Sequence, residues 1–105
     1  MSLAGLLVFA TDVAALGLPT AQGLVLTETF YWDLNDGTRA WTKRWHAERN
    51  AAGKYPAMNQ AGVYAGTLHY LKARAALGAN PDGKSVAAKM KEMPTDDPLF
   101  GKGTI

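Results

Sequence analysis

The longest periodic segment of the chain, residues 55–78, constrains the fold most. Its apolar residues recur at intervals of three and four, which places one set along a single helix face: Ala61, Tyr64, Leu68, Leu71 and Ala75. Pro56 suits a helix start, and Gly78 suits the position just past a helix end. The segment therefore predicts a helix of about six turns. An adjoining stripe widens its predicted buried arc: Val63, Tyr70 and Leu77.

Two glycines interrupt this predicted helix, Gly62 and Gly66, one turn apart. Each costs a helix in water about 1 kcal/mol relative to alanine. Their presence predicts that another backbone packs closely against this stripe. A membrane-spanning helix is excluded because the segment carries too many polar residues: Asn59, Gln60, His69, Lys72 and Arg74.

The composition describes one globular domain at most, with 105 residues, 48% of them hydrophobic and 19% charged. The formal net charge of +2 is too small to imply a nucleic-acid partner. The chain has no cysteine, which excludes disulfides, zinc–thiolate sites, iron–sulfur clusters and thiol catalysis.

No arrangement of residues indicates an enzyme or a cofactor. The two serines are Ser2 and Ser85, and neither suits a catalytic triad. His46 and His69 fall in different predicted helices without metal-ligand spacing, and the glycines form no phosphate loop. Paired acids such as Asp33 and Asp36 adjoin turn residues, which favours turn and cap roles over a catalytic pair.

The short apolar run Leu6–Ala10 predicts a strand buried on both faces. A signal peptide is less favoured there, because no positive charge precedes the run and Asp12 interrupts it. The other expected elements are one helical turn over 13–16, a connector at 18–20, a strand over 23–30, helices over 38–50 and 84–93, and an extended or irregular end over 95–105.

The helix over residues 38–50 is expected to begin after a cap at Asn35 or Asp36 and to bury Trp41 and Trp45. The resulting order is β-(short α)-β-α-α-α, which is part of an α/β layered arrangement. Two strands are too few to cover three amphipathic helices. We therefore expect only part of a larger α/β lobe.

Side chains that follow the two predicted strands form the candidate binding site. Asp12 comes after the first strand, and Tyr31 and Trp32 come after the second. In open α/β sheets ligands bind outside the carboxyl ends of strands, where aromatic rings can enclose an organic solute and an acid can hold an ammonium group. The alternative is that Trp32 packs at the rim of the core and that Asp12 caps a helix.

Three segments together resemble a known family. They are TDVAALGLPTAQGLVLTETFYWDLNDGTRAWTKR, YPAMNQAGVYAGTLHYLKA and VAAKMKEMPTDDPLFGKGTI. In this order they are similar to periplasmic substrate-binding proteins of branched-chain amino-acid-type ABC transporters. The similarity covers nearly all of residues 4–105 and corresponds to part of the C-terminal half of such proteins. Residues 1–3 read as an expression leader.

The resemblance implies a two-lobed α/β fold that closes on its ligand around a hinge. It implies a non-enzymatic periplasmic receptor that delivers a small solute, an amino acid or an aromatic acid, to an ABC permease. Five positions match cleft or hinge segments: Asp12, Tyr31, Trp32, Gln60 and Tyr64. A partial lobe leaves apolar surface uncovered, so a non-physiological homo-oligomer is expected. The alternatives are a ligand-binding sensor domain of the same fold and a stand-alone helical interaction module that uses the Trp41/Trp45 face.

Overall fold

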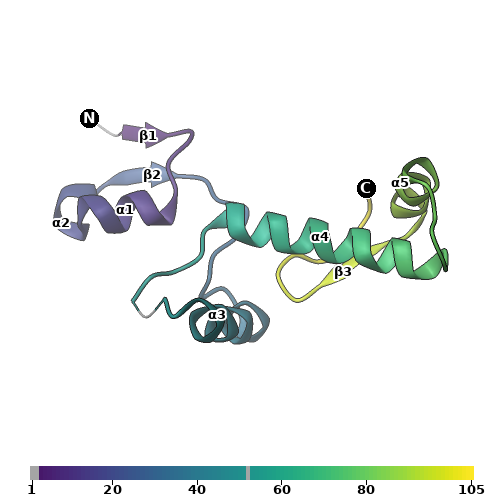
Figure 1. Ribbon diagram of the computed structural model, residues 1–105. Helices are drawn as coiled ribbons and strands as arrows, with labels where there is room; N and C mark the ends of the chain where they lie inside the picture. The colour runs from purple at the N-terminus through teal and green to yellow at the C-terminus, as the bar shows by residue number, and fades with distance from the viewer. Residues whose placement is uncertain (1–2, 52) are drawn as a thin grey trace. The chain divides into compact units, whose positions relative to one another are not determined.

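The structure, a computed structural model, describes residues 3–51 and 53–105. It divides into two units, Met1–Gln60 and Ala61–Ile105 (Figure 1). The first unit holds β1 (Leu3–Gly5), α1 (Ala10–Leu16), α2 (Leu18–Ala21), β2 (Leu24–Leu26) and α3 (Asp36–Arg49). The second unit contains most of α4 (Met58–Ala76), followed by α5 (Gly83–Glu92), β3 (Thr95–Asp97) and β4 (Gly101–Gly103). The mixed α/β composition is confirmed, and the expected β-(short α)-β-α-α-α order is present with a second short helix, α2, and a C-terminal hairpin added.

The first unit starts with a parallel pair of strands, β1 and β2, connected through α1 and α2. Leu3 pairs with Leu24 and Gly5 with Leu26. Parallel strands need a crossover connection, and the two short helices provide it (Figure 1). Both strands consequently end at the same edge, where the segments that carry Asp12 and Trp32 begin.

The strand predicted over Leu6–Ala10 is wrong. β1 ends at Gly5, and Leu6 and Leu7 lie in a turn with exposed fractions of 94% and 80%. The backbone N–H groups of Phe9 and Ala10 donate to carboxylates instead of to a neighbouring strand. Those bonds start α1, so an apolar run that resembles a buried strand is divided between a turn and a helix.

Two further expectations for the first unit need correction. The connector expected at residues 18–20 is helical, because Pro19 lies in the first turn of α2, where its fixed φ suits a helix. The strand expected over 23–30 is ordered as a strand only over its apolar part, Leu24–Leu26. The polar residues that follow leave the ladder, and Glu28 bonds to the start of α1.

α3 begins where the sequence places its cap. The Asn35 side chain accepts a hydrogen bond from the Thr38 N–H at 3.0 Å, and the Thr38 hydroxyl accepts one from the Asn35 N–H at 3.0 Å. This reciprocal arrangement satisfies two backbone donors at the helix start. The core of the first unit forms on the inner face of α3, where Trp41 meets Phe30 edge-to-face with ring centroids 5.5 Å apart. Trp45 is only half-buried.

α4 is a helix, as predicted, but it buries a narrower arc than its sequence suggests. Ala61, His69 and Ala73 are its buried residues, whereas the predicted second stripe is exposed, with Val63 71% and Tyr70 43% accessible. A side-chain carbon added at either helix glycine, 62 or 66, meets nothing within 4 Å among the described residues. The described part of the chain therefore does not supply the close backbone contact predicted at these glycines.

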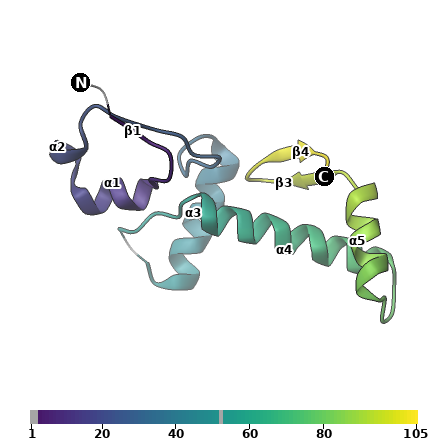
Figure 2. The same cartoon turned by 90° about the horizontal axis from the view of Figure 1, so that it is seen from above.

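The second unit is held together by contacts from α4 to α5 and to the β3–β4 hairpin (Figure 2). The buried His69 ring donates through Nε2 to the Met90 carbonyl at 2.8 Å, and Lys72 Nζ donates to the Asp96 carbonyl at 2.7 Å. Residues 95–105 were expected to be extended or irregular, and part of this segment forms the antiparallel β3–β4 pair. No helix among the described residues is long and apolar enough to cross a membrane.

The start of α5 supplies a pH-dependent stabilisation. Asp82 Oδ1 accepts from the N–H groups of Lys84 and Ser85, and the Ser85 hydroxyl donates to Asp82 Oδ2 at 2.6 Å. The Ser85 hydroxyl, followed by the Ser85 backbone N–H, holds the pKa of Asp82 below its usual value. A lowered pKa in the folded state means that the carboxylate stabilises the fold above its unfolded pKa.

We expect this contribution to disappear as the pH falls from the ordinary pKa of an aspartate through the lower folded pKa of Asp82. Melting temperatures measured by circular dichroism across the acid range test this expectation. Asp82→Asn is the matched control, since an asparagine cap does not titrate. The melting temperature of the variant should fall less steeply with acid than that of the wild type. Equal slopes would contradict the assignment.

Candidate ligand-binding site

Two carboxylates gather where α1 begins, at the carboxyl edge of the β1–β2 pair. Asp12 Oδ2 accepts from the Phe9 N–H at 2.8 Å, and Glu28 Oε1 accepts from the Ala10 N–H at 2.5 Å. Asp12 is exposed, and its carboxylate is used within its own turn of chain. Glu28 comes from the segment after β2, so its bond ties the end of β2 to the helix that follows β1.

Aromatic side chains lie next along the chain, after the end of β2. The rings of Tyr31 and Trp32 are 5.9 Å apart, and Trp32 stacks on Tyr55 with centroids 4.2 Å apart and an interplanar angle of 27°. His46 meets Tyr55 edge-on at 5.3 Å and lies 5.6 Å from the ring of Trp45. We call these five residues the aromatic cluster. Tyr31 and Tyr55 keep 50% and 42% of their surfaces exposed.

The end of α3 explains why Tyr55 reaches the cluster. Asn50 adopts a left-handed conformation, with φ 47° and ψ 42°, which stops the helix. The chain then turns back, with the Lys54 N–H donating to the Ala51 carbonyl at 3.0 Å. His46 Nε2 lies 2.5 Å from the Lys54 carbonyl. Because a carbonyl only accepts, His46 carries its hydrogen on Nε2 in this contact.

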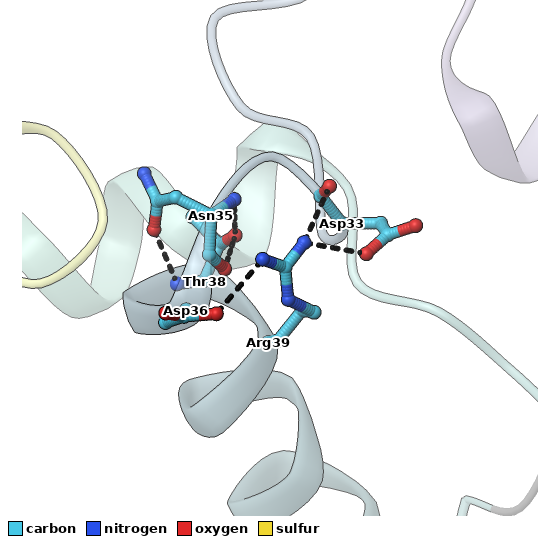
Figure 3. A network of polar contacts seen from close by, with 5 residues as sticks. All are labelled: Asp33, Asn35, Asp36, Thr38 and Arg39. Carbon is cyan, nitrogen blue, oxygen red and sulfur yellow. Dashed lines mark hydrogen bonds and ion pairs between the residues drawn. The ribbon is translucent and has the colours of Figure 1, made fainter.

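A polar network lies just past Trp32 in the chain (Figure 3). The Arg39 guanidinium contacts Asp33 Oδ1 and Asp36 Oδ1, each at 2.9 Å, and also donates to the Asp33 carbonyl. The hydrogen bond to Asp36 and then that to Asp33 raise the pKa of Arg39 above its ordinary value. Such exposed pairs contribute little to stability. They pair the guanidinium of Arg39 with two carboxylates and connect α3 to the loop that precedes it.

The remaining predicted site residues lie on α4. The Gln60 side chain accepts from the Ala57 N–H at 3.0 Å, so it caps the start of α4. Tyr64 is half-buried and belongs to the second unit. Of the five predicted residues, the structure thus brings Tyr31 and Trp32 into contact with each other, while Asp12 and Gln60 make hydrogen bonds close to their own positions in the chain.

The participants that were not predicted as site residues include Glu28, His46 and Tyr55. Glu28 lies in the polar part of the predicted strand, after Leu24–Leu26, and a carboxylate there was a signal that it serves another element. His46 and Tyr55 gave no comparable signal, because their approach depends on the left-handed turn at Asn50. The buried face of Trp41 also matters, since an exposed fraction of 5% weighs against the interaction module proposed for the Trp41/Trp45 face.

Comparison with known proteins shows which protein family the chain belongs to. The family model described as "Periplasmic binding protein" matches residues 1–105. The chain therefore belongs to the periplasmic binding protein family, whose members are typically non-enzymatic.

A crystal structure of a periplasmic binding protein from Burkholderia mallei is similar over the entire chain. The sequence identity is 44% and the TM-score is 0.88. This chain spans 27% of the length of that solved protein. The partial lobe inferred from the order of elements is confirmed by this coverage. A comparison with curated proteins found no match.

Proposed function

We propose that the chain is part of a periplasmic receptor that captures a small organic solute and delivers it to an ABC-type permease. The default solute is a branched-chain amino acid, with aromatic acids or amides as the next class. The proposed ligand contacts are Asp12, Tyr31, Trp32, Gln60 and Tyr64. The observation that carries the proposal is the pair Tyr31 and Trp32 just past the carboxyl end of β2, within a chain of the periplasmic binding protein family.

The proposed mechanism follows from the aromatic side chains that lie past the carboxyl end of β2. Half-exposed aromatic rings present apolar surface that a solute can cover. A solute that makes more contacts with a closed form than with an open form shifts the population toward closure. A chain that supplies the residues on only one side of the solute makes only part of the contacts that stabilise the closed form. We therefore expect the 105-residue chain alone to bind leucine more weakly than a millimolar dissociation constant.

A thermal-shift screen of amino acids and aromatic acids against the full-length receptor tests the proposal. A ligand of the folded state at one hundred times its dissociation constant stabilises it by about 2.7 kcal/mol. We expect one solute class to raise the melting temperature and Trp32→Ala to reduce that rise. Tyr70→Ala is the control, because Tyr70 is an exposed aromatic residue on α4 outside the proposed contacts.

Each negative result has its own meaning. If no solute raises the melting temperature of the wild type, the receptor function is wrong. If a solute does so equally with Trp32→Ala, the function stands and the proposed contacts are wrong. A sensor domain of the same fold would bind a solute in the same assay. Identification of the membrane protein that the loaded receptor binds separates that alternative from transport.

A further inference from the structure

The ring of Trp32 is held from one side by a residue outside the proposed ligand contacts. Tyr55 stacks on it at 4.2 Å and 27°, an almost parallel geometry. Stacked aromatic pairs contribute energy beyond the area they bury, so this contact favours one orientation of the indole. Trp32 is half-buried, so part of the residue remains accessible.

Tyr55 is in turn fixed by the end of α3. His46 meets its ring edge-on at 5.3 Å and 66°. The same His46 ring contacts the Lys54 carbonyl, which directly precedes Tyr55 in the chain. A helical residue thereby contacts both the backbone next to Tyr55 and the side chain of Tyr55. The arrangement runs from α3 through His46 and Tyr55 to Trp32, all within the first unit.

We infer that Tyr55 is a positioning residue that sets the orientation of Trp32 and thereby the solute preference of the receptor. This inference rests on the proposed function, because it takes Trp32 as a wall of the ligand site. Tyr55 acts through the indole and not by contact with the solute. Loss of the Tyr55 ring frees the indole to adopt other rotamers. Binding of a solute must then order the indole, and the lost conformational entropy lowers the affinity.

The matched variants are Tyr55→Leu, which removes the stacked ring, and Tyr55→Phe, which keeps it. The chain has three tryptophans, so a sample labelled with 5-fluorotryptophan gives three fluorine resonances. Trp32→Phe identifies the resonance of Trp32. We expect Tyr55→Leu to move that resonance toward its position in unfolded protein and to leave the resonance of the buried Trp41 in place. Tyr55→Phe should leave all three near their wild-type positions.

The second readout is binding to the full-length receptor, with leucine and phenylalanine as the probes. The energy of an aromatic pair corresponds to an affinity loss of about three- to tenfold for Tyr55→Leu. Tyr55→Phe should bind as the wild type does. We expect the loss to be larger for phenylalanine than for leucine, because a planar ring depends more on the orientation of the indole.

The outcomes separate this inference from the proposed function. An unmoved Trp32 resonance in Tyr55→Leu overturns it, as does a moved resonance with unchanged affinities for both probes. If neither probe binds the wild type, both are replaced by the solute found in the thermal-shift screen. If that screen finds none, the receptor function fails and the role in solute preference fails with it. The fluorine spectrum then still decides whether Tyr55 orients Trp32.

Discussion

Trp41→Ala is expected to lower the free energy of unfolding of the chain by about 3–5 kcal/mol, the range for removal of a buried aromatic ring. Trp41 is 5% exposed and meets Phe30, which is 2% exposed, edge-to-face. The substitution removes the largest side chain of this core and leaves the Phe30 ring without that contact. Urea unfolding monitored by circular dichroism measures the change. A loss of this size is a large part of the total free energy of unfolding of a small domain.

Trp45→Ala is the matched control for this substitution. It lies one turn along the same helix, is only half-buried, and contacts the His46 ring at 5.6 Å. We expect its loss to be clearly smaller than that of Trp41→Ala. Trp41→Phe should recover part of the stability, because it restores an aromatic neighbour for Phe30. Equal losses for the two alanine variants would show that the core does not lie on the Trp41 face of α3.

Thr42→Val is expected to raise the free energy of unfolding by about 1–2 kcal/mol. Thr42 is 3% exposed, and its Oγ1 has no hydrogen-bond partner among the residues that the structure describes. A buried hydroxyl without a partner loses its bonds to water on folding. Valine has nearly the same shape and carries no polar atom, so the cost is removed without a cavity.

Thr38→Val supplies the opposite expectation one turn earlier on α3. Thr38 is fully buried, and its hydroxyl both accepts from the Asn35 N–H and donates to the Asn35 carbonyl. The same substitution there leaves a backbone donor unpaired and should cost about 1–3 kcal/mol. Paired urea titrations compare the two valine variants. A shared sign would contradict the roles given to the two hydroxyls.

The helices of the chain could be predicted largely from sequence because their signals are local. The Asn35 cap and the proline after α5 each act within a few residues of the helix that they bound. The apolar periodicity of α4 predicted its type and extent well. The periodicity predicted the burial of α4 poorly. It indicates which residues share a face, but it does not indicate whether another element covers that face, and Val63 is exposed.

The strands and the site were harder to predict, for a related reason. A run such as Leu6–Ala10 has strand composition, but Glu28, 18 residues beyond Ala10, accepts a backbone bond that starts a helix there. The contact between the rings of Tyr31 and Trp32 follows from their adjacency in the chain. Tyr55 was not selected from the sequence, since its contact with Trp32 depends on a turn at the end of α3. Whether the five predicted residues contact a solute stays a prediction.

The reciprocal bonds between Asn35 and Thr38 have a consequence for the order in which the first unit forms. They join residues three apart, so little chain entropy is lost when they close. The β1–β2 pairing joins Leu3 to Leu24, and the intervening chain must be ordered before that contact stabilises anything. The start of α3 is therefore among the contacts that close at lowest entropic cost, whereas the sheet edge beside the candidate site depends on structure formed around it.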